Sequence, residues 1–129
     1  ALETLTALAA AGIGLALLTN GAAATQREKI QRFELADYFS HILVEEEIGV
    51  GKPAVEAFER ALAALGASAD QTWMIGDDLK WDIAGAAALG IHAVWYNPHG
   101  DALPAGAPAQ PDWEIRELAE LIDLAGPAR

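Results

Sequence analysis

The amino-acid sequence predicts an α/β domain built on a parallel sheet. Short apolar runs that fit strands alternate with longer alanine-rich or amphipathic segments that fit helices. Such alternation joins parallel strands through right-handed helical crossovers. The chain has 129 residues, enough to bury one core, and no internal repeat or linker divides it. We therefore expect residues 1–129 to belong to a single domain.

The first third of the chain predicts two helices and two strands. Residues 2–11 are rich in alanine and leucine, with leucines spaced for one helix face, and Gly12 is a typical stop. The nearly unbroken apolar run 13–18 fits a strand buried on both faces. The polar segment 22–35 fits a half-exposed helix, and 41–44 fits a second strand.

The middle of the chain predicts a loop, two helices and a strand. We expect the acidic segment 45–51 to be a solvated loop, and Pro53 suits the first position of the next helix. That helix carries an apolar stripe at intervals of three and four, formed by Val55, Phe58, Leu62 and Leu65. A third strand is predicted over 72–75, and an alanine-rich helix over 80–89.

The last third predicts one strand, a loop and one helix. Residues 91–95 fit a fourth strand, followed by turn residues at 97–100 and a proline-rich loop over 101–111. Asp112 can cap a final helix. Its expected inward face consists of Ile115, Leu118, Leu121 and Ile122.

The amino-acid composition limits the kinds of molecule that the protein is expected to bind. The formal net charge is −11, because 19 acidic residues outnumber 8 basic ones, and no basic stripe is present to neutralise phosphates. We therefore expect neither nucleic acid nor an anionic membrane as a partner, whereas a small phosphate ester needs only one or two donors. The sequence contains no cysteine, so it has no disulfide or thiolate metal site and is compatible with a reducing cytosol, the location we expect.

Polar groups follow the first two predicted strands. Thr19 supplies a hydroxyl with the backbone amides of Asn20 and Gly21 behind it, and Lys52 supplies an ammonium group. Because the carboxyl ends of parallel strands meet at one edge of a sheet, these donors can share a pocket that binds phosphoryl oxygens. Taken singly, Thr–Asn–Gly also fits a tight turn, and a lysine before a helix is usually solvated.

Three carboxylates follow the third predicted strand. Gly76 leads into Asp77 and Asp78, and Asp82 lies in the first turn of the next helix. Like charges this close need a compensating cation or strong donors, and oxygen ligands suit Mg²⁺. The alternative interpretation is a solvated acidic turn in which Asp82 is a charge at the helix start.

Together these motifs resemble the second, third and fourth motifs of the haloacid dehalogenase-like hydrolase superfamily, in its phosphatase branch. The resemblance extends over nearly the whole chain and includes residues 46–53 and 94–98. It implies a three-layer Rossmann-like core of which this chain is the C-terminal part. It also implies that Thr19 and the Asn20 amide bind the transferring phosphoryl group and that Lys52 steadies both the phosphoryl oxygens and the nucleophile.

The same resemblance implies a role for each of the three carboxylates. Asp77 would ligate Mg²⁺ directly, and Asp82 would act through a water or by positioning Lys52. Asp78 is a further candidate ligand whose place is often a serine in relatives. The dehalogenase branch typically lacks this acid pair, so the residues favour phosphoester hydrolysis over carbon–halogen cleavage.

One motif of the family is absent. No Asp–x–Asp, which would supply the nucleophile and the general acid/base, occurs in the 129 residues. In the family that motif lies on a central strand between the strands predicted at 13–18 and 72–75, and a helical cap usually precedes the segment found here. The only methionine is Met74, so we expect this chain to be a piece of a longer protein. The two exposed strand edges would then pair with the missing N-terminal segment or with another copy of the chain, or would rearrange.

Three functions remain open at this stage. The first is a Mg²⁺-dependent phosphatase of a small phosphorylated metabolite that works through an aspartyl-phosphate, with the nucleophile outside this chain. The second is a non-catalytic module that binds phosphate, metal or another protein. The third, disfavoured by the acid pair, is a dehalogenase.

Overall fold

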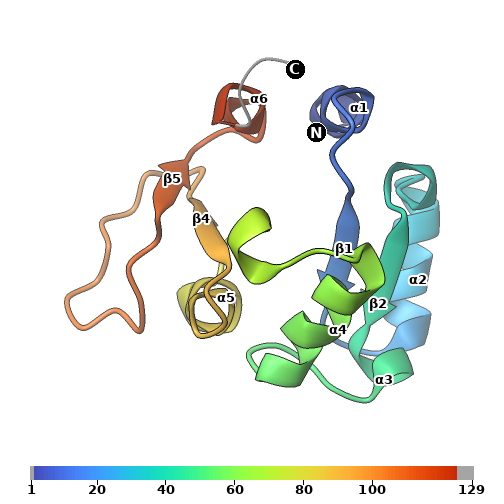
Figure 1. Cartoon of the computed structure of the whole chain (residues 1–129), viewed down its shortest axis with the longest axis horizontal. Helices are drawn as coiled ribbons and strands as arrows, with labels where there is room; N and C mark the ends of the chain where they lie inside the picture. Colours follow the sequence, from blue (N-terminus) through green and yellow to red (C-terminus); the bar gives the residue numbers. More distant parts are fainter. Residues whose placement is uncertain (1, 125–129) are drawn as a thin grey trace.

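A computed structural model of the chain describes residues 2–124 (Figure 1). The helices are α1 (Leu2–Ala10), α2 (Ala23–Arg32), α3 (Glu45–Ile48), α4 (Val55–Leu65), α5 (Gly85–Ala87) and α6 (Glu120–Leu124). The strands are β1 (Ala16–Thr19), β2 (His41–Val44), β3 (Trp73–Gly76), β4 (His92–Tyr96) and β5 (Trp113–Ile115). Two short 3-10 turns, η1 (Ala36–Tyr38) and η2 (Ala69–Gln71), and one π-helical turn, η3 (Leu79–Ala84), complete the description.

The strands form two parallel sheets. β1 pairs with β2, with Leu17 opposite Ile42, and the second sheet has the order β3-β4-β5, with Ile75 opposite Val94. Within residues 2–124, no strand joins β1 to β3. Figure 1 shows the β1/β2 pair and the β4/β5 pair on opposite sides of the molecule. The α/β fold with parallel strands is confirmed, as is the gap between the strands expected at 13–18 and 72–75.

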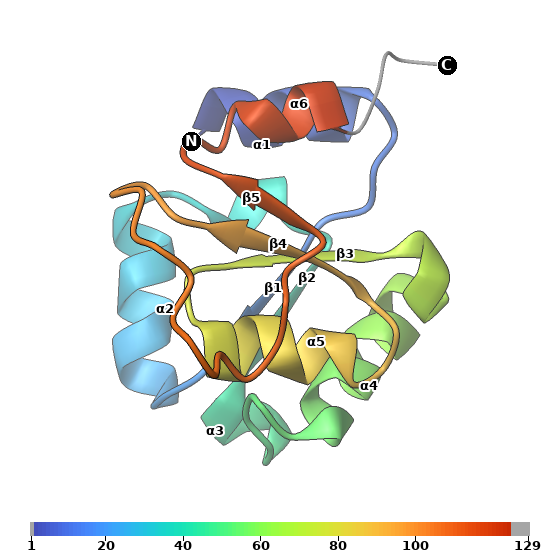
Figure 2. The same cartoon turned by 90° about the vertical axis from the view of Figure 1, so that its left-hand side faces the viewer.

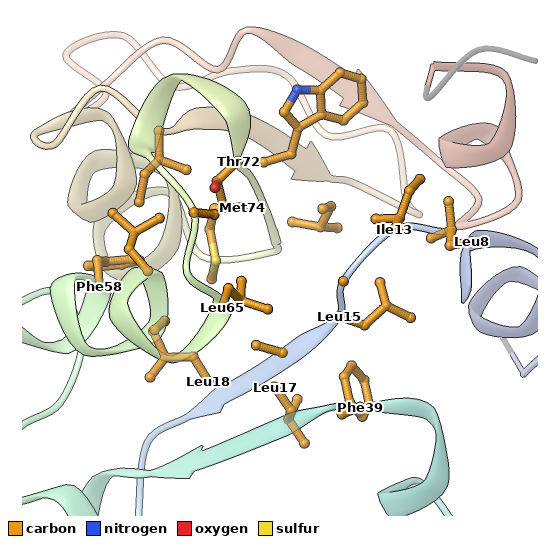
Figure 3. Close-up of a pocket in the computed structure, with 18 of the residues that line it drawn as sticks. Leu8, Ile13, Leu15, Leu17, Leu18, Phe39, Phe58, Leu65, Thr72 and Met74 are labelled. Atoms are coloured by element: carbon orange, nitrogen blue, oxygen red, sulfur yellow. The ribbon is translucent and has the colours of Figure 1, made fainter. Parts of the chain in front are cut away.

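A pocket of about 700 Å³ lies between β1 and β3 (Figure 3). Its lining is mainly apolar and includes Leu15 and Leu18 on one side and Met74 on the other. All residues of β1 and β3 are only partly buried, whereas the three central residues of β4 are fully buried. The strand predicted to be buried on both faces is therefore half-buried, because the edge facing the pocket is unpaired.

Helices connect the two sheets on both faces of the pocket. Figure 2 shows α1 and α6 together on one side of the strands and α4 and α5 on the other. Leu8 of α1 and Leu121 of α6 share a buried cluster with Val94 of β4. On the opposite face Phe58 packs with Ile91, and Leu18 and Met74 lie against them. No helix described over residues 2–124 has the length and apolar character needed to cross a bilayer.

The segment after the proline-rich loop differs from the prediction of a helix that begins at Asp112. Residues 113–115 form β5, and the carboxylate of Asp112 accepts a hydrogen bond from the amide of Ala93 (2.7 Å). The helix begins only at Glu120, whose carboxylate accepts the amides of Glu117 (2.8 Å) and Arg116 (2.7 Å), and these bonds lower its pKa. The predicted helix was wrong because apolar spacing over so few residues also fits a strand followed by a short helix.

Two smaller predictions in the middle of the chain were also wrong. The loop expected over 45–51 begins with the helix α3 (Glu45–Ile48). The helix after it starts at Val55, and Pro53 lies in the preceding turn. The alanine-rich segment 80–89 is helical as expected over most of its length, although its first turns are η3, which has π geometry.

Candidate functional site

The polar residues at the carboxyl ends of β1 and β3 are connected through Lys52. The side chain of Asn20, just after β1, binds the backbone of Lys52 in both directions. Its Nδ2 donates to the Lys52 carbonyl (2.8 Å), and its Oδ1 accepts the Lys52 amide (2.8 Å). The loop before α4 is thereby held against the end of β1, so two segments that lie 32 residues apart share one site.

Lys52 reaches from this loop to the segment after β3. Its Nζ donates to Asp82 Oδ1 (2.7 Å), and the two side chains are only 13% and 7% exposed. The second carboxylate oxygen of Asp82 accepts the amide of Asp78 (3.1 Å). A Cβ at Gly76 would overlap the Asp82 carboxylate, so the glycine makes room for Asp82 to approach β3 and reach Lys52. The result is a buried, hydrogen-bonded ion pair at the edge of the pocket, which Lys52 itself lines.

Two of the three phosphate donors predicted after β1, the Thr19 hydroxyl and the Gly21 amide, already have partners. The Thr19 hydroxyl donates to Gln26 Oε1 (3.1 Å), and the Gly21 amide donates to Glu45 Oε1 (2.8 Å). Thr19 lies at the predicted edge of the sheet, and its hydroxyl is within hydrogen-bond distance of Gln26 on α2 and of the Asn20 carbonyl (3.5 Å). For Thr19 to donate to a phosphoryl oxygen, its hydroxyl must rotate away from Gln26.

The three predicted metal-ligating carboxylates occupy different environments. Asp77 is exposed, and its side chain makes no hydrogen bond within residues 2–124, while its carbonyl accepts the indole N–H of Trp95 (3.1 Å). Asp78 caps η3, because its Oδ1 accepts the amides of Lys80 (2.9 Å) and Trp81 (2.7 Å). Asp82 is paired with Lys52.

The three carboxylates after β3 meet the requirements of a Mg²⁺ site in part. Over residues 2–124, no three His, Cys, Asp or Glu side chains are grouped to hold a metal ion. Mg²⁺ commonly uses only one or two protein carboxylates and completes its shell with water and substrate phosphate. The exposed carboxylate of Asp77 can be such a ligand.

Comparison with known proteins identifies the family. The model of the haloacid dehalogenase-like hydrolases matches residues 1–90. The chain belongs to the haloacid dehalogenase-like hydrolases. The resemblance noted in the sequence is confirmed, and the matched range contains Thr19, Lys52 and the three aspartates after β3.

Individual relatives within this family are similar over most of the chain. Phosphoserine phosphatase from Thermus thermophilus is 39% identical over 111 residues, which cover 86% of this chain and 44% of that protein. Ribulose-1,5-bisphosphate 5-phosphatase from Halopiger xanaduensis is 40% identical over 128 residues, 95% of this chain and 54% of that protein. The structure of the HAD-hydrolase YfnB from Bacillus subtilis, bound to magnesium, has a TM-score of 0.88 at 30% identity and covers 98% of this chain and 54% of that one. The chain therefore spans about half the length of the curated relatives it matches.

The sequence did not predict the hydrogen-bond partners of Glu45, Glu46 and Glu47, which were expected to be solvated. Glu45 binds the amide of Gly21, and Glu46 binds the amide of Ala23 (2.8 Å). Glu47 and Arg27 form a two-bond ion pair (2.6 and 3.0 Å), and this contact lowers the pKa of the Glu47 carboxyl and raises that of the Arg27 guanidinium. A run of three glutamates does not indicate these hydrogen-bond partners, because the partners lie about twenty residues earlier in the sequence. The contacts form only when α3 packs against α2.

Proposed function

We propose that the protein containing this chain is a Mg²⁺-dependent phosphatase of a small phosphorylated metabolite, and that this chain supplies its phosphate- and cation-binding groups. The observation that carries the proposal is the buried Lys52–Asp82 ion pair tied to Asn20. The two relatives described above are named as phosphatases of small phosphorylated molecules. The absence of cysteine is compatible with a cytoplasmic location, which we also propose.

The donors of the site suit a phosphoryl group. Lys52 supplies a positive charge in a position that is only 13% exposed, where electrostatic stabilisation is stronger than in water. The Thr19 hydroxyl would exchange Gln26 for a phosphoryl oxygen, and the Asn20 amide would donate to a second one. The Gly21 amide, which the sequence also suggested as a phosphate donor, is directed at Glu45, so we give it a supporting role.

The acidic residues would hold the cation. We propose Asp77 as a direct ligand of Mg²⁺, Asp82 as a group that acts through water or by holding Lys52, and Asp78 as a further candidate ligand. Bound Mg²⁺ would neutralise part of the phosphoryl charge. One structural relative of this chain was solved with magnesium bound.

The nucleophile must come from outside these residues. We propose that a further segment of the same protein inserts a strand between β1 and β3, with an aspartate past its carboxyl end. The aspartate would attack phosphorus as the P–O bond to the ester's alcohol breaks and the protonated alcohol leaves, and water would then hydrolyse the aspartyl-phosphate to inorganic phosphate and free aspartate. The apolar pocket of about 700 Å³ and the two unpaired parallel edges suit a short apolar strand. An aspartate at its end would face Lys52, which lines the same pocket.

The proposal is tested with the protein expressed from its complete open reading frame. We expect hydrolysis of p-nitrophenyl phosphate with Mg²⁺, loss of activity on chelation with EDTA, and loss of activity in Asp77→Asn. The 129-residue chain alone serves as the control and should be inactive. Unchanged turnover by Asp77→Asn would overturn the assigned metal site.

Two other outcomes would favour the alternative functions. If the complete protein binds phosphate or Mg²⁺ but shows no turnover, it is a non-catalytic binding module, in keeping with the absent Asp–x–Asp. Halide release from a 2-haloacid without added metal would instead identify a dehalogenase.

A further inference from the structure

Glu45 contacts both loops that carry the proposed phosphate donors. Its Oε1 accepts the amide of Gly21, the residue after Thr19–Asn20, at 2.8 Å. The rest of its carboxylate lies over Gly51, the residue before Lys52, where an added Cβ would overlap it. The carboxylate of Glu45 is therefore placed between the loop after β1 and the loop that holds Lys52.

We propose that Glu45 is a positioning residue that sets the spacing between the Thr19–Asn20 donors and the Lys52 ammonium group. The catalytic consequence of this assignment rests on the function proposed above. Two links then join the same loops, because Asn20 binds the Lys52 backbone and Glu45 bridges the flanking glycines. A hydrogen bond from a backbone amide to a carboxylate is charge-assisted and stronger than a neutral one. The two neutral hydrogen bonds of Asn20, the charge-assisted bond of Glu45 and the packing of its carboxylate on Gly51 together fix the distance and the angle between the donors, which a catalytic site requires.

The neighbouring glutamates provide a natural comparison. Glu45 is partly buried and its carboxylate bridges the two loops, whereas the exposed carboxylate of Glu46 accepts the amide of Ala23 at the start of α2. The backbone amide of Glu46 donates to the Gly21 carbonyl (3.3 Å), a bond that Glu46→Ala keeps. Both carboxylates accept one backbone amide at 2.8 Å from adjacent positions of α3. Glu46→Ala is therefore a matched control that removes the same kind of bond without touching Gly51.

The first test uses the 129-residue chain and two-dimensional NMR. Glu45→Ala should shift the amide resonances of Gly21 and Lys52 and the side-chain amide of Asn20, whereas Glu46→Ala should shift Ala23 and leave Lys52 in place. Glu45→Gln keeps an oxygen that can accept the Gly21 amide, so it should restore most of the native shifts. If Glu45→Ala leaves the Lys52 and Asn20 resonances unchanged, the positioning role is refuted.

The second test is a kinetic double-mutant cycle in the complete phosphatase. Glu45→Ala should lower kcat by on the order of tenfold to a hundredfold, because small misplacements of catalytic groups are that costly. Glu45→Gln should recover most of kcat, and Glu46→Ala should stay within about twofold of the wild type. Gly51→Ala should displace the Glu45 carboxylate and lower kcat in the wild type, but should add little in the Glu45→Ala background.

The outcomes separate the two proposals. Additive effects of Gly51→Ala and Glu45→Ala, or equal losses from Glu45→Ala and Glu46→Ala, would overturn the role of Glu45 while leaving the phosphatase assignment intact. A wild-type protein without phosphatase activity would overturn the proposed function, and the NMR comparison would still decide whether Glu45 positions Lys52.

Discussion

Gly76 is the residue that allows Asp82 to reach Lys52. We predict that Gly76→Ala displaces the Asp82 carboxylate, which occupies the space of the added methyl group. Overpacking of this kind lowers the free energy of unfolding by about 1–3 kcal/mol, measured by urea denaturation. Gly14→Ala is the control, because its Cβ would meet Leu65 at 3.5 Å, an ordinary van der Waals contact. Equal losses from the two variants would contradict the prediction.

The Lys52–Asp82 pair should contribute to stability as well as to the site. Asp82→Asn leaves the Lys52 ammonium, 13% exposed, without its counter-charge, and removing one partner of a buried pair costs about 3–5 kcal/mol. We expect a loss of this size in urea denaturation. The double variant Lys52→Met/Asp82→Leu should lose less than Asp82→Asn, because no unpaired charge remains buried. A loss below about 1 kcal/mol for Asp82→Asn would mean that the pair behaves like a surface ion pair.

The positions of Thr19 at the end of β1 and of Asp77 just after β3 could be predicted, because apolar runs show where strands end; their roles stay predictions. The role predicted for Asp82, acting by positioning Lys52, stays a prediction, and the 2.7 Å ion pair between the two side chains is compatible with it. The partners of Thr19 and Gly21 could not be predicted. Both depend on side chains from α2 and α3, whose docking is a tertiary property that no local pattern encodes.

At the scale of elements, the contact between α2 and α3 should depend on pH. The hydrogen bond with Arg27 lowers the pKa of Glu47, so the folded state holds the carboxylate more strongly than the unfolded state does. The stabilisation is therefore fully present above the ordinary pKa of glutamate and is lost as the pH falls through the lowered pKa. We predict that carboxyl-carbon NMR titration gives Glu47 a lower pKa in the wild type than in Arg27→Gln. Identical titration midpoints in the wild type and in Arg27→Gln would contradict the ion pair.

Helices and strands were predictable where the spacing of apolar residues fits only one of them, and not where the same residues fit both a helix and a strand. The four predicted strands became β1, β2, β3 and β4, and the stripe from Val55 to Leu65 became α4. The segment from Asp112 failed because Trp113–Ile115 is too short to show a period, and its pairing with β4 depends on the path of the preceding loop. Likewise, the helix Glu45–Ile48 could not be predicted, because a single helical turn is stable only through its packing against α2.

At the scale of the whole molecule, no strand pairing joins the two sheets within residues 2–124, and they are held together by packed helices and by the Lys52–Asp82 pair. α1 and α6 join them on one face and α4 on the other, while the edges of β1 and β3 remain unpaired across the pocket. A strand inserted there would extend both sheets into one and bury the half-exposed residues of β1 and β3. The fold and the proposed active site would thus be completed by the same segment, because Lys52 lines the pocket that this strand would fill.

This arrangement predicts which backbone amides exchange with solvent. In the 129-residue chain, amides of β1 and β3 that do not donate to β2 or β4 should exchange rapidly with deuterium, whereas those of β4, which is paired on both sides, should be protected. In the complete protein the same β1 and β3 amides should become as protected as those of β4. Hydrogen exchange followed by NMR measures both, with light scattering to confirm that the short chain is monomeric. Strong protection of β1 and β3 in a monomeric short chain would mean that the two edges are already paired, and the inserted strand would then have no place to bind.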